Sequence, residues 1–220
     1  MLFDLHNHTR YSPDSRVEPR TLIAFARRIG LAGLAITDHN EVRGVHEAEE
    51  AAGSDFLVIP GIEVSTRDGH VLAYGVREII PRDLSAAETA ERIIALGGVP
   101  VAAHPYRFWS GLGEATTLRI PFAAYETRNS RTLRRGNERA RALAKARNVG
   151  ETGGSDSHFL NEIARAVTAV EGSQLRVEDV LEAVARGRTR VQGLDRGPVA
   201  TARYVTKCVG EWLLRGMRRI

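Results

Sequence analysis

Most histidines of this sequence lie in short segments beside carboxylates, at spacings that suit metal binding. His6 and His8 are separated by one residue in Asp4-Leu5-His6-Asn7-His8, at the end of a β-rich run. Residues i and i+2 of a strand face the same side of a sheet, so both imidazoles can reach one ion. Such an element alone occurs in several hydrolase classes, so the other polar residues must decide which chemistry is meant.

Seven further metal-ligand candidates share this placement at the ends of β-rich runs or in the adjoining loops. They are Asp14, His39, Glu63, His70, His104, Asp156 and His158. Each alone could be a turn or capping residue, but six of the seven histidines lie in such places, which indicates one common site. Neutral imidazoles and carboxylates suit manganese, iron or zinc, and the lack of thiolates disfavours a structural zinc site. The seventh histidine, His46, falls inside a helix-like segment and is expected on the surface.

The segments that position these residues alternate between strand-like and helix-like patterns. Strands are predicted over 2–6, 34–37, 56–62, 71–75, 99–103, 122–126, 150–153 and 189–192, and helices over 19–29, 42–52, 85–96, 131–147 and 177–186. Repeated strand–helix units predict an α/β fold with a parallel sheet, either open or closed into a barrel. The C-terminal strand ends of such a barrel meet at one rim, where active sites are built. The candidate ligands are therefore expected at that rim.

Composition indicates a soluble cytoplasmic protein with one sizeable domain. The chain has 220 residues, 43% hydrophobic and 26% charged, and a single cysteine, Cys208, that excludes an internal disulfide framework. The first ten residues lack the pattern of a signal peptide, and the longest uncharged stretch, 93–106, is too short to cross a bilayer.

The basic balance of the chain is compatible with a phosphorylated partner but does not require one. The net charge is +4 and nearly all basic side chains are arginine, which binds phosphate bidentately. Genome composition explains an arginine excess equally well. Residues 200–219 read as a basic amphipathic helix; we expect it to pack on the barrel, with a dimer contact or a membrane-surface role as alternatives.

Five segments, taken together and in order, resemble the motifs of the PHP (polymerase and histidinol phosphatase) family of metal-dependent phosphoesterases. They are Asp-Leu-His-Asn-His at 4–8, Thr-Asp-His at 37–39, Gly-Ile-Glu at 61–63, Ala-His-Pro at 103–105 and Gly-Ser-Asp-Ser-His at 154–158. The resemblance extends over about residues 2 to 192. It implies a distorted seven-stranded (β/α) barrel over 1–198, followed by the basic C-terminal helix over 199–220.

The resemblance also implies three divalent transition-metal ions, of manganese, iron or zinc, and a ligand set for each. His6, His8, Glu63 and Asp156 would hold the first ion; Glu63, His70 and His104 the second; and Asp14, His39 and His158 the third. Families differ at the positions of Asp14 and His70. Two ions about 3.5–4 Å apart polarise a phosphoryl oxygen and turn a shared water into a hydroxide nucleophile. His6, His8, Glu63, Asp156 and Arg107 would then be the catalytic residues, and Asp4 and Asp38 are expected to orient ligand imidazoles.

Arginines close to the motifs are expected to bind the substrate, which would be a phosphorylated small molecule, a nucleotide or an oligonucleotide. The candidates are Arg43, Arg107, Arg128, Arg131 and Arg165. A surface ion pair is the simpler role for each one taken singly. Arg107, three residues after His104, is the strongest candidate for a phosphate contact. No membrane span and no obligatory protein partner are expected.

Two other functions fit parts of the pattern. Amidohydrolases share the barrel and metal logic, but they usually carry a metal-bridging lysine, and the lysines here, Lys145 and Lys207, lie in helix-like segments. A non-catalytic PHP-like module for nucleic-acid binding or RNA processing would predict eroded ligand positions, whereas every matching position is filled. The loop over 109–119 does not specify a substrate.

Overall fold

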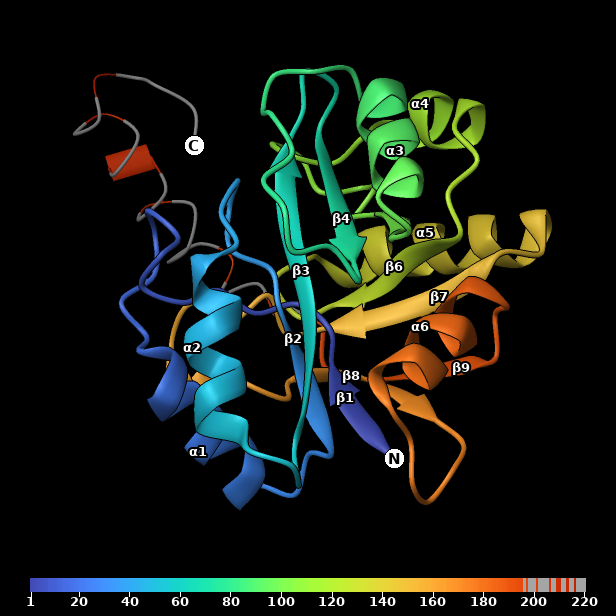
Figure 1. Ribbon diagram of the computed structural model, residues 1–220. Helices are drawn as coiled ribbons and strands as arrows, with labels where there is room; N and C mark the ends of the chain where they lie inside the picture. Colours follow the sequence, from blue (N-terminus) through green and yellow to red (C-terminus); the bar gives the residue numbers. More distant parts are fainter. Residues whose placement is uncertain are drawn as a thin grey trace.

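A single sheet rolled into a nearly closed barrel dominates the protein (Figure 1). The computed structural model describes residues 1–195 and, after them, 197, 201, 206, 209, 210, 213 and 216. Within this part, nine strands pair in the order β7-β6-β5-β4-β3-β2-β1-β8-β9. They are β1 (Leu2–Asp4), β2 (Gly33–Ile36), β3 (Leu57–Ser65), β4 (His70–Tyr74), β5 (Val99–Ala102), β6 (Ala124–Asn129), β7 (Gly150–Gly154), β8 (Ala166–Val170) and β9 (Thr189–Gly193).

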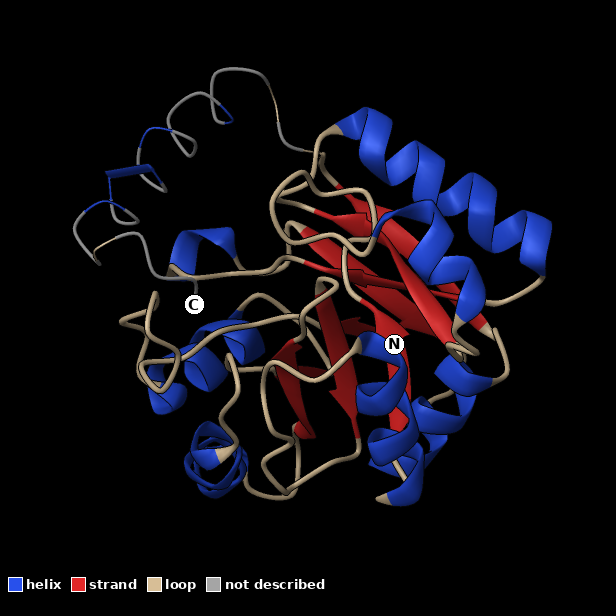
Figure 2. Cartoon of the chain, turned by 90° about the horizontal axis from the view of Figure 1, so that it is seen from above, coloured by secondary structure: helices blue, strands red, loops and turns tan. Residues whose placement is uncertain are grey.

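Helices surround the strands (Figure 2). They are α1 (Pro19–Arg28), α2 (Arg43–Ala52), α3 (Ala86–Ala95), α4 (Gly113–Arg119), α5 (Arg134–Arg147), α6 (Val177–Ala185) and the 3₁₀ turn η1 (Leu160–Glu162). Local signals set several of their ends. Pro19 begins α1, where its missing N–H costs nothing. Ser85 and Glu88 form a capping box that satisfies free N–H groups at the start of α3.

Three apolar clusters hold the layers together. One lies between α1, α2 and strands such as β2, with Leu22 and Leu34 fully buried. A second includes residues of α3, β4 and β5, such as Ile93 and Val71. The third gathers Phe3, Leu72 and other strand residues, and α6 packs against it. Burial of each such side chain stabilises the fold by about 1.5–3 kcal/mol, and together these contacts hold the strand ends in place.

The barrel is closed where β7, at one edge of the sheet, contacts β1 and β8. The N–H of Leu5, just after β1, donates to the Gly153 carbonyl of β7 at 3.4 Å. The Gly153 N–H in turn donates to Thr168 Oγ1 of β8 at 2.8 Å. β7 and β1 can approach because Gly154 has no side chain. These contacts place the segments that follow β1 and β7 beside each other.

The structure confirms the expected α/β barrel and finds every predicted strand and helix of the described residues, with small shifts at the ends. It adds β8 and α4, which the sequence analysis missed, and the sheet has nine strands rather than seven. The expectation of a parallel sheet is wrong in part, because β4, β8 and β9 run antiparallel to their neighbours. As a consequence, the first residue of β4, His70, lies at the rim where β3 and β5 end.

The predicted C-terminal helix over 199–220 lies largely outside the described residues, so the domain boundary at 198 stays a prediction. Among the residues that the structure describes, no helix is long and apolar enough to cross a membrane.

Gly154→Ala should destabilise the protein, because a Cβ there would overlap His6 and lie 2.7 Å from the His6 backbone nitrogen. Overpacking of this kind costs about 1–3 kcal/mol, and each kcal/mol lowers the melting temperature by about 2–4 °C in a chain of this size. Thermal unfolding followed by circular dichroism measures the change. Gly197→Ala is the control, since no atom lies within 4 Å of its Cβ position. Equal melting temperatures of the two variants would show that β7 does not need this glycine.

Candidate metal centre

All nine predicted ligand side chains lie together at one rim of the barrel. They follow β1, β2, β5 and β7, belong to β3, or begin β4. Asp14 and His70 are half-buried and the other seven are buried. The set is His6, His8, Asp14, His39, Glu63, His70, His104, Asp156 and His158. His46, by contrast, has an 82% exposed side chain, as expected. The arrangement brings together residues up to 152 positions apart, from His6 to His158.

Glu63 lies at the centre of this cluster, with its two carboxylate oxygens facing different imidazoles. The distances from carboxylate oxygen to ring nitrogen are 2.8 Å for His70 and 3.0 Å for His104 on Oε1, and 3.1 Å for His6, 3.3 Å for His8 and 3.3 Å for His39 on Oε2. A carboxylate accepts about four hydrogen bonds, so five facing nitrogens exceed what it can satisfy alone. The geometry is that of ligands grouped around cations.

A second carboxylate, Asp14, faces the other end of the cluster. Its Oδ2 lies 2.6 Å from His158 Nε2 and 3.8 Å from His39 Nε2. Four groups of ligand atoms, each within 4.8 Å of one another, can be drawn from the described residues: His8, Asp14, His39 and His158; His6, His104 and Asp156; His6, His8 and Glu63; and His39, Glu63 and His70.

The residues present fit divalent metal ions, because several buried ring nitrogens lack hydrogen-bond partners. These are Nε2 of His8, Nδ1 of His39 and Nδ1 of His104. The first two face Glu63 Oε2 without a hydrogen bond. Burial lowers the pKa of His39 to about 3, so its imidazole is neutral at neutral pH and has a lone pair for a metal. A buried acceptor beside a carboxylate is unfavourable unless a cation lies between them.

The carboxylates of the cluster stay ionised despite their burial. Burial alone would raise the pKa of Glu63, but the charge of the His6 imidazole, whose own pKa lies above its usual range, outweighs it and holds the Glu63 pKa well below its usual range. Burial likewise opposes ionisation of Asp156, and the charges of Arg107 and His6 keep its pKa low. Anionic carboxylates are the form that binds metal.

Glu126 belongs to the site, although the sequence analysis did not select it. Its Oε1 lies 2.9 Å from His6 Nδ1, so His6 Nε2 is left to face Glu63. Its Oε2 accepts hydrogen bonds from the His104 N–H at 2.9 Å and from Asn129 Nδ2 at 3.1 Å. Carboxylates that bond the far nitrogen of a ligand histidine orient the ring and raise its basicity. Its position could have indicated this role, since Glu126 is a carboxylate at the end of the predicted strand 122–126, like the predicted ligands.

Asp4 and Asp38 do not orient imidazoles, contrary to expectation. Asp4 accepts hydrogen bonds from the backbone N–H groups of Ser155 and Ala164, both at 2.8 Å. Asp38 accepts from the backbone N–H and the hydroxyl of Thr9, at 2.5 and 2.6 Å. Both carboxylates hold loops at the rim, because their short side chains reach neighbouring backbone before they reach a ring nitrogen.

Two of the five predicted arginines lie in the cluster. Arg107 Nη1 is 2.5 Å from Asp156 Oδ2, and the arginine side chain is 13% exposed. Arg131 is buried, pairs with the other Asp156 oxygen at 3.6 Å and contacts His158 Nδ1. Asp156 therefore lies between two guanidinium groups, which adds positive charge beside the candidate ligands.

The other three arginines have partners outside the metal cluster, and their substrate contacts stay predictions. Arg43 is 70% exposed and pairs with Glu41 at 2.7 Å. Arg128 pairs with Asp195 at 2.6 Å, and Arg165 donates to the Asn161 carbonyl at 3.1 Å. Proximity in sequence to a motif did not predict these partners, because each is set by tertiary contacts or by a local turn.

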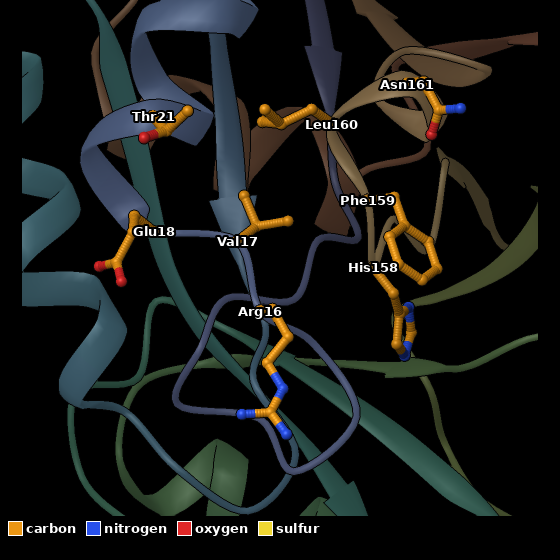
Figure 3. A pocket seen from close by; sticks show the side chains of 8 residues that line it. All are labelled: Arg16, Val17, Glu18, Thr21, His158, Phe159, Leu160 and Asn161. Carbon is orange, nitrogen blue, oxygen red and sulfur yellow. The ribbon is translucent and has the colours of Figure 1, made fainter. Parts of the chain in front are cut away.

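An open hollow of about 450 Å³ borders the cluster at His158 (Figure 3). Its lining is mostly apolar and consists of Arg16, Val17, Glu18, Thr21, His158, Phe159, Leu160 and Asn161. The side chains of Arg16 and His158 extend toward the same end of the hollow (Figure 3). The hollow has room for an organic group beside the metal cluster.

Family models match the segments that carry these residues. The PHP domain family model matches residues 4–161, and a PHP-associated model matches residues 134–189. The first match covers most of the chain and all five motif segments. The chain belongs to the PHP domain family, as the resemblance indicated.

Relatives with curated sequences match parts of the chain. An uncharacterized protein of Methanocaldococcus jannaschii is 40% identical over 119 residues, which cover 48% of this chain and 68% of that protein. The 5′-3′ exoribonuclease Rnm of Salmonella typhimurium is 29% identical over 161 residues, covering 58% of this chain and 55% of Rnm. The match thus spans just over half the length of Rnm.

Solved structures share the fold at low sequence identity. A candidate metal-dependent phosphoesterase of Bifidobacterium adolescentis has a TM-score of 0.66 and 21% identity, with 84% of this chain and 96% of that chain covered. Endonuclease Q in complex with a DNA duplex gives a TM-score of 0.67 and 17% identity, with 89% and 60% covered. An amidohydrolase of Chromobacterium violaceum gives 0.66 and 18%, with 86% and 97% covered.

Glu126→Gln should weaken manganese binding, because the neutral amide no longer supports the charge of the His6 ring. Loss of such a carboxylate partner typically costs about 10- to 100-fold in metal affinity. Isothermal titration of the chelator-treated protein with manganese measures the effect. Glu171→Gln is the control, since the Glu171 side chain is 87% exposed. Equal affinities in the two variants would show that Glu126 does not act on the centre.

Proposed function

We propose that the protein hydrolyses phosphate esters at a trinuclear metal centre. The proposal rests chiefly on the two oxygens of Glu63, one facing two imidazoles and the other facing three, as a bridging ligand would. The proposed ligand sets are His6, His8, Glu63 and Asp156; Glu63, His70 and His104; and Asp14, His39 and His158. Manganese, iron and zinc all suit these donors.

When bound, the ions polarise the phosphoryl oxygens and activate a water molecule as the nucleophile. Two serine hydroxyls beside the cluster are engaged elsewhere. Ser157 Oγ donates to Asn7 Oδ1 at 2.8 Å, and Ser15 Oγ donates to the His8 carbonyl at 3.0 Å. Because these serines are engaged in holding the loops, water is the nucleophile that the site favours.

Arg107 and Arg131 would bind and orient the phosphate. Both guanidinium groups contact Asp156, so their charge lies beside the proposed ligands. A guanidinium has no lone pair to offer a metal, but its planar N–H groups match phosphate oxygens bidentately. Arg107 is the more exposed of the two and therefore the better candidate for a direct contact.

The substrate class that we propose is a phosphomonoester, a nucleotide or an oligonucleotide. Rnm is named a 5′-3′ exoribonuclease, and the structure of Endonuclease Q contains a DNA duplex, which supports nucleic acid among these options. The hollow beside His158 offers space for the organic part of such an ester. One cysteine in the chain suits a reducing compartment, and we propose the cytoplasm.

The alternative functions have less support. An amidohydrolase with a bridging lysine would need that lysine at the rim, yet Lys145 is exposed on α5, and Lys207 lies outside the described residues. A non-catalytic module does not need ligands, whereas all nine ligand positions are filled and gathered here. Both alternatives predict no hydrolysis of phosphate esters.

A manganese-supplemented screen of sugar phosphates, nucleotides and short oligonucleotides should reveal hydrolysis, and elemental analysis should approach three ions per chain. Glu63→Gln should lower both metal content and activity, because one carboxylate serves two ions. Glu171→Gln again serves as the exposed control. Full activity of Glu63→Gln would refute the bridging role, and a metal content near zero after reconstitution would refute the trinuclear centre.

Arg107→Ala should lower kcat/KM for phosphate esters about ten- to a hundredfold while metal content is retained. This loss in kcat/KM corresponds to the roughly 1.5–3 kcal/mol that a charge-assisted hydrogen bond contributes. Arg107→Lys should retain only part of the parent's kcat/KM, since lysine supplies the charge without the planar fork of N–H groups. Arg77→Ala is the matched control, because Arg77 is 59% exposed and paired with Glu49 at 2.7 Å. Parent-like kinetics in Arg107→Ala would assign phosphate binding to another residue.

A further inference from the structure

Two adjacent aromatic side chains, Phe108 and Trp109, are strongly exposed in the loop between β5 and α4. Their exposed fractions are 86% and 69%. The two rings contact each other edge to face, with centroids 4.8 Å apart. Large aromatic rings are normally buried, so an exposed pair in contact is a candidate binding region. Phe108 and Trp109 together form the aromatic pair of this loop.

The loop that carries the aromatic pair is fixed to the metal centre by backbone hydrogen bonds. The Arg107 N–H donates to the His104 carbonyl at 2.8 Å, and the Gly111 N–H donates to the Arg107 carbonyl at 3.0 Å, so the loop is a closed turn. The His70 N–H donates to the Ser110 carbonyl at 2.9 Å. Both His104 and His70 face Glu63. The position of the pair is therefore tied to two proposed metal ligands.

The aromatic pair lies within reach of a strand whose phosphate is bound at the centre. Consecutive Cα atoms are about 3.8 Å apart, so the Trp109 Cα lies within about 8 Å of the Arg107 Cα. Arg107 itself touches Asp156. A stacked strand rises about 3.4 Å per nucleotide, so a base one to a few nucleotides from that phosphate reaches the pair.

Two arginines, each paired with a carboxylate, lie beside the loop. Arg139 of α5 stacks over the Tyr106 ring at 4.1 Å from its centroid, and Arg107 lies one residue before the pair. Aromatic rings beside arginines are the combination that binds single-stranded nucleic acid, where rings stack on bases and guanidinium groups face phosphates. Two isolated rings provide too little apolar area for a stable protein interface.

We propose that Phe108 and Trp109 form a stacking platform for the bases of a single-stranded nucleic-acid substrate. The inference rests on the proposed phosphoesterase function and names its substrate class. Stacking on such rings contributes about five- to a hundredfold in affinity per base and depends little on sequence. The platform would favour strands with bases over phosphate esters without them.

Fluorescence of Trp109 tests contact with bases directly. The chain has two tryptophans, so Trp212→Phe leaves Trp109 as the single reporter. A short phosphorothioate oligonucleotide, which resists hydrolysis, should quench this fluorescence, and an abasic phosphorothioate strand of equal charge should not. Equal quenching by both strands, or quenching by neither, would overturn the platform. Quenching by anionic vesicles but not by oligonucleotide would overturn it as well.

Kinetics test the contribution of the stacking platform to the reaction. In the double variant Phe108→Ala/Trp109→Ala, KM for a single-stranded oligonucleotide should rise about five- to a hundredfold, while KM for an abasic strand stays at the parent value. Trp109→Phe should keep most of the parent's preference for base-containing strands. Trp109→Leu should lose the share that Trp109 contributes, because stacking requires a ring. Ile79→Ala is the control, a 57% exposed apolar side chain on the segment after β4.

The two hypotheses fail in different ways. If the parent hydrolyses abasic and base-containing strands with equal KM, the platform is wrong and the phosphoesterase function stands. If the parent hydrolyses no phosphate ester, the proposed function is wrong, and the fluorescence titration still decides whether the aromatic pair binds bases. An equal rise in KM for both strands in the double variant would show a structural role of the loop and overturn the platform.

Discussion

The buried charge of Glu63 is the constraint on which the rim of this barrel depends. Its side chain is 1% exposed, and an isolated carboxylate in such a place would be severely destabilising. Five imidazoles face it, and they come from the ends of β1, β2 and β5 and from the start of β4. The site can therefore form only when these strands are closed into one sheet, which couples ligand geometry to the barrel itself.

Close backbone packing makes that convergence possible. Gly61, two residues before Glu63, leaves room for neighbouring strands, since a Cβ there would lie 2.6 Å from the Ala73 carbonyl oxygen and 3.2 Å from that of Ile36. Gly154 allows the same approach between β7 and His6. The antiparallel direction of β4 then pairs His70 with Ser65 at the rim, where the His70 ring faces Glu63. Small residues and one strand reversal thus determine which imidazoles meet.

Charge is balanced around the cluster in layers. Asp156 lies between the guanidinium groups of Arg107 and Arg131, and Glu126 faces His6 from behind. Arg107 thereby has two roles in the proposed reaction, since it compensates Asp156 and presents positive charge to an incoming phosphate. The same loop continues into Phe108 and Trp109, so the groups proposed to bind phosphate and bases share one fixed segment.

The sequence by itself determined the barrel class, the family and the nine side chains that gather at the rim, because strand-end histidines and carboxylates leave a local pattern that survives without coordinates. Tertiary structure alone decided which partners face one another. It replaced Asp4 and Asp38 by Glu126 as the carboxylate behind an imidazole, and it separated Arg107 and Arg131 from Arg43, Arg128 and Arg165. It also set the direction of β4, which runs antiparallel to β3 and β5. The physical reason is that a side chain's partner depends on distances between segments far apart in the chain, such as the 120 residues between His6 and Glu126, which strand patterns and residue types do not encode.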